Sequence, residues 1–369
     1  MSVPDTRARR LARLAARTDW PKVVDAYTGE SYGPEVLAGL WAPDRVTADE
    51  TCAALRFAAI GEGSAVLAAA TQLLPYLVEA AGDPDVTVRF AVLRTIAHIA
   101  GTGNTAPAAR VDALWPAAWE RAAEELLPLL DDGAPVVRGG TVRALARSTA
   151  HADALIARFR ARFNEEPDRW SAGRLVLGVG ELARHAVMGR DEAVAWLRHL
   201  MTVDGKGPEP DIAEDADAWV AWDEEIRHDV RLQAVEALCH ALPGYADPRY
   251  APVTTAALLA PWAVPPAECV VPTADVITEA DRHLGADLPG RLALARALLR
   301  HAGTTERAGA LRVAASLMSR WPSAVPALLP TVARLVDDTS PENRDAALEA
   351  CARGLVASWA AADGRFPHS

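Results

Sequence analysis

Apolar residues recur along this chain at helical spacing around a small number of arginines. The positions four, seven and eleven residues after Arg89 are Leu93, Ile96 and Ala100. At 100° per residue these positions fall within about 40° of Arg89 on a helix, so the arginine lies in the middle of an apolar stripe. A guanidinium in such a place needs a carboxylate partner, which we expect at the start of its own helix or of a neighbouring one.

The same frame returns four more times, after Arg138, Arg231 and Arg344 and, more weakly, after Arg291. The stripe residues of these copies are Val142, Leu145 and Thr149; Val235, Leu238 and Leu242; Leu348, Cys351 and Leu355; and Ala295, Leu298 and Ala302. A Leu-Leu-Pro that should bend the preceding helix ends at Pro75 and at Pro330, each fourteen residues before its arginine. In the first copy, Asp83 and Pro84 have the chemistry of a helix N-cap and first helical position. The pattern therefore predicts repeated helical hairpins.

These features resemble the HEAT repeat family, in which a proline-bent first helix precedes an Asp…Val-Arg opening of the second. The matching residues are Pro75, Asp83, Val88 and Arg89; Asp132, Val137 and Arg138; and Pro330, Asp338 and Arg344, with Asn343 in place of the last valine. The resemblance implies an all-α fold, a right-handed α-α superhelix of stacked hairpins. It also implies a structural ladder formed by Asp83, Arg89, Arg138, Arg231 and Arg344. It says little about activity, because such folds host many unrelated functions.

We expect one elongated solenoid over residues 1–363, because each repeat packs mainly on its neighbours. Its N-terminal part, 1–72, is irregular, and a disordered tail is expected at 364–369. The clearer repeats are 73–150, 226–244, 288–302 and 328–359. Leu175 to Ala183 imitates a dinucleotide-binding turn, but that motif needs a parallel sheet, and we interpret it as a helix whose glycines allow close packing.

An acidic insertion at 204–225 interrupts the array. It carries nine acids and one lysine, a net charge of −8 within a chain of −11. Trp219 and Trp222 lie three residues apart, on one face if this part is helical. One interpretation is a solvated insertion whose tryptophans pack on the solenoid, and the other is a contact loop for a basic partner.

The candidate chemistry argues against an enzyme. Cys52, Cys239, Cys269 and Cys351 are far apart, and neither His-Glu-x-x-His nor the paired His-Glu motifs of HEAT-type di-iron hydroxylases occur. We therefore predict no catalytic residues, cofactor or metal. No run approaches the ~18 apolar residues of a membrane span, and we place the protein in the cytoplasm. Arginine greatly outnumbers the two lysines, Lys22 and Lys206, which we attribute to the base composition of a bacterial genome.

The face of each second helix opposite its stripe should form the concave wall, at the positions five and nine residues after each arginine. These residues are Arg94 and His98, Arg143 and Arg147, Glu236 and His240, Arg296 and Arg300, and Glu349 and Arg353. Six arginines against two glutamates give this wall a charge of +4. The sequence thus predicts a basic concave face on an acidic protein.

Three interpretations of this face remain open. A binding scaffold would use it for an acidic or phosphorylated segment of another protein, because arginine pairs bidentately with carboxylate and phosphate. A nucleic-acid binder, related in fold to the HEAT-like alkylpurine DNA glycosylases, would place the arginines on phosphates, although a pI of 5.4 is low for that class. The arginines could also make only local pairs. A toxin-neutralising or regulatory role fits an acidic solenoid, and the oligomeric state stays open.

Overall fold

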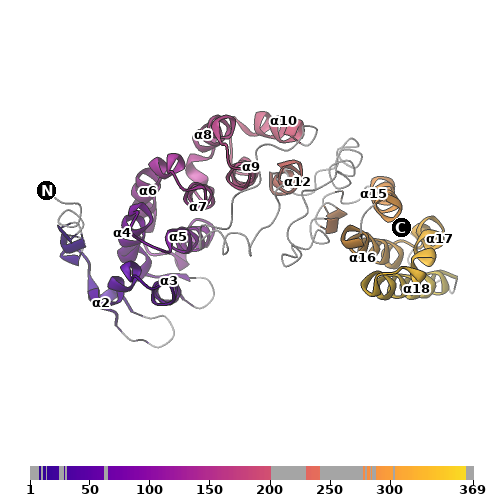
Figure 1. The fold of residues 1–369 in the computed structure, drawn as a ribbon, viewed down its shortest axis with the longest axis horizontal. Coiled ribbons are helices and arrows are strands. Elements are labelled where there is room, and N and C mark those ends of the chain that lie inside the picture. Colours follow the sequence, from indigo (N-terminus) through magenta and orange to yellow (C-terminus); the bar gives the residue numbers. More distant parts are fainter. Residues whose placement is uncertain are drawn as a thin grey trace. The chain divides into compact units, whose positions relative to one another are not determined.

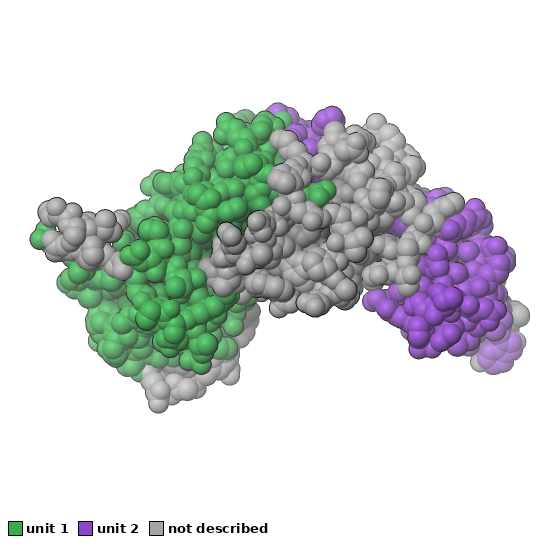
Figure 2. Space-filling model, viewed as in Figure 1, with its two compact units in different colours: residues 1–190, 207–225 green, residues 191–206, 226–369 purple. Residues whose placement is uncertain are grey.

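The computed structural model describes residues 8–362 except 10, 14, 25–28, 30, 62–64, 201–229, 242–276, 279–280, 283, 285–287 and 302–303. These residues are mostly helical, which confirms the all-α prediction. They form two compact units that divide between Arg190 and Asp191 (Figure 2). The insertion at 204–225 with Trp219 and Trp222, the tail at 364–369 and the side chain of Arg231 lie outside the described part. That the whole chain forms one solenoid stays a prediction.

The described part of unit 1 starts with short elements and continues with seven longer helices. The short ones are η1 (Trp20–Lys22), α2 (Pro34–Ala38) and η2 (Gly39–Trp41). The longer helices are α3 (Arg45–Ala59), α4 (Ala68–Gly82), α5 (Arg89–Gly103), α6 (Trp115–Leu126), α7 (Pro135–Leu145), α8 (Ala152–Glu165) and α9 (Arg169–Ala183). Between them lie the turns η3 (Ala108–Arg110), η4 (Leu127–Asp131) and η5 (Thr149–His151). The strands β1 (Ile60–Gly61) and β2 (Ala65–Val66) pair antiparallel, with Ile60 opposite Val66.

The helices of unit 1 form two layers (Figure 1). The inner layer consists of α3, α5, α7 and α9, each packed on the next, while α4, α6 and α8 lie outside them. Each outer helix pairs with the inner helix that follows it: α4 with α5, α6 and η4 with α7, and α8 with α9. Pro75 lies inside α4, and Pro128 marks the change from α6 to η4. This is a stack of helical hairpins.

Asp83 does not start α5, contrary to the prediction. The helix begins at Arg89, and Asp83 follows the last residue of α4. The Asp83 carboxylate accepts the backbone N–H of Asp85 at 3.1 Å and the indole N–H of Trp41 at 2.9 Å. Because an aspartate that binds the amide two residues later stabilises a turn, this residue shapes the connection between the two helices.

The anchor arginines of unit 1 bind carboxylates of the following hairpin. Arg89 Nη2 lies 2.6 Å from Asp132, which sits in the turn before α7. Arg138 makes a two-point pair with Glu166 in the turn before α9, at 2.8 and 2.6 Å. Each carboxylate also accepts a backbone N–H two residues further on, from Ala134 and from Asp168 respectively. The arginine stripe of one inner helix therefore faces the next repeat.

Glycines allow the inner helices to approach closely. Gly140 of α7 lies against Leu93 of the α5 stripe, and Gly178 of α9 lies against Val142 of the α7 stripe. The second contact falls within the segment that imitates a dinucleotide-binding turn, which is an ordinary helix here. Stripe residues and glycines thus form the contact surfaces between successive repeats.

Unit 2 contains two stacked hairpins near its C-terminal end. Its elements are α10 (Arg190–Leu200), which starts at the division, α12 (Val230–Ala241), α15 (Leu288–His301), α16 (Thr304–Arg320), η6 (Pro322–Ala324), α17 (Val325–Ala333), η7 (Arg334–Asp337) and α18 (Pro341–Ala362). The helix α15 packs on α16 and α17, and α18 packs on α16 and α17. The pairs are therefore α15 with α16 and α17 with α18.

The sequence pattern predicts that the helix carrying Arg291 is the second helix of a hairpin, and the structure contradicts this prediction. Its helix, α15, is the first of its hairpin and lies beside α17, the proline-containing first helix of the last one. Arg291 binds Asp281, ten residues upstream, at 2.8 and 2.5 Å and lies over the ring of Trp321. The arginine that binds the following hairpin is Arg307 of α16, whose Nη1 lies 2.7 Å from Asp338.

Arg344 is exposed, so its predicted place in a buried stripe is wrong. The residues of α18 that are buried against its neighbours are Asn343, Ala347, Ala350, Gly354 and Ala357. The predicted stripe residues Leu348 and Leu355 are 53% and 61% exposed. The physical reason is that the arginine stripe faces the following repeat, and no described helix follows α18.

Candidate binding pocket

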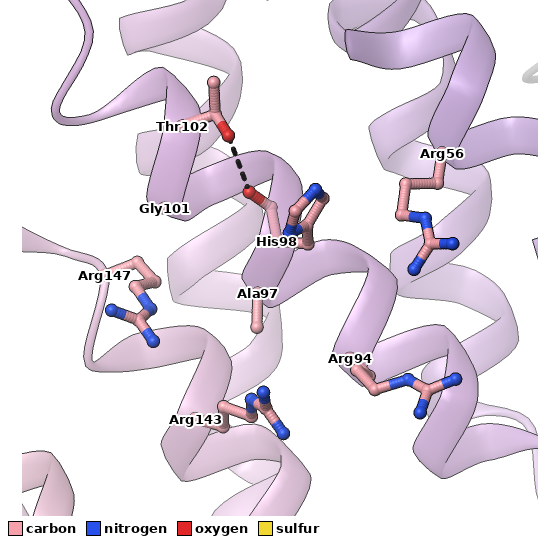
Figure 3. A pocket seen from close by; sticks show the side chains of 8 residues that line it. All are labelled: Arg56, Arg94, Ala97, His98, Gly101, Thr102, Arg143 and Arg147. Atoms are coloured by element: carbon pink, nitrogen blue, oxygen red, sulfur yellow. Dashed lines mark hydrogen bonds between the residues drawn. The ribbon is translucent and has the colours of Figure 1, made fainter. Parts of the chain in front are cut away.

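A pocket of about 370 Å³ opens on the inner layer of unit 1 (Figure 3). Four arginines and a histidine dominate its lining, and none of its eight described lining residues is acidic. These residues are Arg56, Arg94, Ala97, His98, Gly101, Thr102, Arg143 and Arg147. They come from α3, α5 and the end of α7, so three successive inner helices contribute to one basic hollow.

The helical repeat explains why the side chains of α5 meet here. Arg94 and His98 are four residues apart, so they share one face of α5, with Leu93 and Ile96 buried on the other side. Figure 3 shows His98 between two pairs of arginines, Arg56 with Arg94 on one side and Arg143 with Arg147 on the other. The arrangement places positive charge on both sides of a single imidazole.

Two of the arginines are held by neighbours outside the pocket. Arg147 Nη1 lies 2.8 Å from Glu181 of α9, and the backbone carbonyl of Arg147 accepts a hydrogen bond from the Asn104 amide at 2.7 Å. The Arg56 guanidinium lies 5.6 Å from the centre of the exposed Phe57 ring. These contacts orient the side chains of Arg56 and Arg147.

The charge of the pocket affects the pKa of His98. Partial burial lowers the pKa of this imidazole below its ordinary value of 6.5, and the positive charges of Arg56, Arg143 and Arg147 lower it further. Both effects disfavour the imidazolium. The pKa of His98 therefore reports the positive charge around it.

Replacing Arg143 with glutamine is expected to raise the pKa of His98 towards 6.5, because one of the repelling charges is removed. The measurement is an NMR titration of the histidine ring resonances, assigned with His98→Gln. The Arg121→Gln change on the outer helix α6 is the matched control and should leave the titration unchanged. An equal shift in both variants would contradict the placement of Arg143 beside His98.

The structure brings together four of the residues predicted for the concave face, Arg94, His98, Arg143 and Arg147. Glu236 and His240 lie one turn apart on α12, with a carboxylate-to-imidazole distance of 3.8 Å. Glu349 and Arg353 pair with each other on the exposed surface of α18.

Arg296 and Arg300 do not belong with this group. They lie on α15, in the layer of first helices, and Arg296 Nε donates to the carbonyl of Ala327 in α17 at 3.1 Å. The pattern predicts them on the concave face only if α15 is the second helix of its hairpin, and α15 is the first.

Sequence reasoning missed Arg56. The helix α3 carries no anchor arginine in the frame of Arg89, so the repeat pattern did not extend to it. Arg307 was also missed, although Leu311, Ala314 and Met318 follow it at the same four, seven and eleven spacing and are fully buried. That spacing was the available signal.

Within the described residues, no group of three or more histidine, cysteine or acidic side chains is placed to hold a metal ion. None of the helices in the described part of the chain has the length and apolarity needed to cross a membrane.

The stack of paired helices, with arginine-to-carboxylate contacts between repeats, defines an α-solenoid of the HEAT/armadillo type. Residues 73–102, which cover most of α4 and α5, match the family model described as HEAT repeat. The family model thus identifies one HEAT repeat, formed by the hairpin of α4 and α5.

Two solved structures are similar at 16% identity. One is the crystal structure of an engineered protein, with 88% of this chain and 97% of that chain covered and a TM-score of 0.23. The other is a designed armadillo repeat protein, with 87% and 99% covered and a TM-score of 0.26. No curated protein matches the chain significantly.

Proposed function

We propose that this chain is a non-catalytic cytoplasmic scaffold that holds an acidic or phosphorylated segment of a protein partner on the inner helices of unit 1. The observation that carries the proposal is the pocket, where four arginines from three inner helices surround His98 without an acidic residue in the described lining. A toxin-neutralising or regulatory role would be one use of such a scaffold.

The chemistry of arginine supports an anionic ligand. A guanidinium is planar, stays charged at every physiological pH and donates two parallel hydrogen bonds to a carboxylate or phosphate. A phosphoryl group carries a charge of about −1.5 to −2 and three acceptor oxygens, so it suits arginines that arrive from different helices. An extended acidic segment would reach the same arginines one carboxylate at a time.

The same chemistry gives little support to catalysis. A neutral histidine acts as a general base most effectively when a carboxylate orients it, or when a nucleophile lies beside it. Among the described lining residues, the only hydroxyl is that of Thr102, which donates to the His98 carbonyl at 3.2 Å, and there is no carboxylate or thiol. The pocket is better suited to binding a negative charge than to transferring a proton.

Reversing Arg94 and Arg143 to glutamate is expected to weaken partner binding at least about tenfold, because two attractive charges become repulsive ones. Arg147 is kept, since a glutamate there would face Glu181 and disturb the stack. The measurement is affinity purification of the tagged chain from its native cells, with and without nuclease, followed by titration of the recovered partner against the purified variants.

The matched control reverses Arg121 and Arg184 to glutamate. Both side chains are exposed and lie outside the pocket lining, and the double change alters the net charge by the same amount as the pocket reversal. A partner protein that survives nuclease and binds this control but not the pocket variant would support the proposal. Equal binding to both variants would place the site elsewhere. Nucleic acid recovered in a salt-sensitive way, and lost with the pocket reversal, would instead support the nucleic-acid alternative.

A further inference from the structure

A second pocket, here called the outer pocket, opens in unit 1 beside the outer helices α6 and α8. Its volume is about 530 Å³, within the range of roughly 300–1,000 Å³ that is typical of small-molecule sites. Its lining comes from α6 and η4, from the end of α7 and from the start of α8. It shares no described lining residue with the pocket around His98, so it is a separate site.

The floor of the outer pocket is apolar. Ala123 of α6, Leu145 of α7 and Leu155 of α8 line it and are only 7%, 0% and 6% exposed. Ser148 also lines it, and its buried hydroxyl already accepts the indole N–H of Trp119 at 3.0 Å. Because burying a polar group without a new partner costs free energy, this floor favours the apolar part of a ligand.

Two carboxylates lie at the rim of the outer pocket, on the α6 side. Glu120 and Glu124 are exposed and one turn apart, so they share one face of the helix. Among the described residues, neither has an ion-pair partner. Like charges at this spacing repel each other, and a cation bound beside both carboxylates would relieve that repulsion.

The α8 side of the rim does not cancel this negative charge. Arg158 lines the pocket there, but its Nη2 lies 2.7 Å from the Asp131 carboxylate, so its charge is already matched. The exposed His151 stands at the start of the same side and carries a charge only as an imidazolium. The two glutamates therefore determine the sign of charge that the outer pocket prefers.

We propose that the outer pocket binds a small hydrophobic amine, with the apolar body on the floor and the ammonium group beside Glu120 and Glu124. An ammonium group has three donors and can bind both carboxylates at once. Leu127 and Pro128 of η4 line the same hollow and supply further apolar contact for the body of the ligand. A carboxylic acid of the same shape would meet two like charges. This site is independent of the basic pocket and of the partner proposed for it.

Three probes that share one apolar body test the proposal: 4-phenylbutylamine, 4-phenylbutanol and 4-phenylbutyrate. Each is titrated into the full chain at neutral pH, and binding is followed through the methyl NMR signals of Leu145 and Leu155. We expect the amine to bind at least about fivefold more tightly than the alcohol, because each exposed charge pair contributes up to about a factor of five. The carboxylate should bind more weakly than the alcohol.

Two pairs of substitutions separate the rim charge from the total charge. Glu120→Gln with Glu124→Gln should weaken binding of the amine about fivefold or more and leave binding of the alcohol unchanged. This variant loses only a repulsive pair, so its thermal unfolding should match that of the unchanged chain. The control, Glu125→Gln with Glu165→Gln, neutralises two exposed glutamates outside the lining and should bind the amine normally.

Ala154→Phe tests whether the probes enter the hollow itself. Ala154 is an exposed lining residue, so a phenylalanine there would occupy the pocket without disturbing the core and should abolish binding of the amine and the alcohol alike. Equal affinity for the amine and the alcohol, or equal weakening in the two glutamate pairs, would overturn the proposal. It would also be overturned if the amine failed to bind while a basic, leucine-containing helical peptide shifted the same signals, because the occupant would then be a protein segment.

Discussion

Replacing Arg138 with methionine is expected to lower the free energy of unfolding by about 2–3 kcal/mol, because the buried carboxylate of Glu166 loses its two-point partner and keeps only Arg162, at 3.1 Å, and the backbone N–H of Asp168. The Glu166 side chain is fully buried and the Arg138 side chain is 7% exposed. Arg138 Nη1 also donates to the backbone carbonyls of Asp132 and Gly133, at 2.9 and 3.1 Å, so the turn before α7 loses its support too. Chemical denaturation and calorimetry of the full chain would measure the loss, which corresponds to a melting temperature lower by roughly 5–10 °C.

The control for this prediction is Arg158→Met, which removes an arginine from an exposed pair. The Arg158 and Asp131 side chains are 51% and 53% exposed, and such pairs contribute no more than about 1 kcal/mol. A third variant, Arg138→Met with Glu166→Leu, removes this pair but leaves Arg162, whose side chain is 12% exposed, without the Glu166 carboxylate, so it should recover only part of the lost stability. If Arg138→Met cost no more than Arg158→Met, the pair would not stabilise the junction between the two repeats.

Replacing Gly139 with alanine is expected to destabilise the chain by about 2–3 kcal/mol, because the new methyl group would overlap a buried indole. A Cβ at Gly139 would lie 2.1 Å from Cζ3 of Trp170. This ring cannot move easily, since it packs edge-on against Phe90 with the centroids 5.8 Å apart and lies under the Arg174 guanidinium. Without the clash, the alanine would stabilise a helix interior by roughly 1 kcal/mol.

The Gly82→Ala variant isolates this steric effect. Gly82 is the last residue of α4, and a Cβ there would have no atom within 4 Å. We expect Gly82→Ala to be neutral or slightly stabilising in the same denaturation experiment. Stabilisation by both changes would show that α7 and α9 are not in close contact at Gly139.

Much of the hairpin architecture could be predicted from the sequence, because helical periodicity is local. The spacing around Arg89 and Arg138 identified two buried stripes, and the same spacing placed Arg94, His98, Arg143 and Arg147 on the opposite faces of their helices. Because α5 and α7 are both inner helices and pack side by side, these four residues line one pocket. The stripe positions and the order of the helices along the chain were therefore enough to predict that these four residues lie together.

Three features depended on how the hairpins stack. The helix α15 has the same stripe pattern as α5 but belongs to the other layer, so Arg296 and Arg300 were assigned to the wrong face. Arg56 joined the pocket from a helix without an anchor arginine. Arg344 and its leucines, predicted to be buried, are exposed because no described helix follows α18.

The sequence by itself determined which residues lie on one face of each helix, since a repeat of 3.6 residues per turn depends only on neighbours along the chain. Only the tertiary structure decided which helix covers that face and which carboxylate meets each arginine, because those contacts join residues of different hairpins, such as Arg89 with Asp132 and Arg138 with Glu166. The same stripe is buried in α5 and exposed in α18 for this reason.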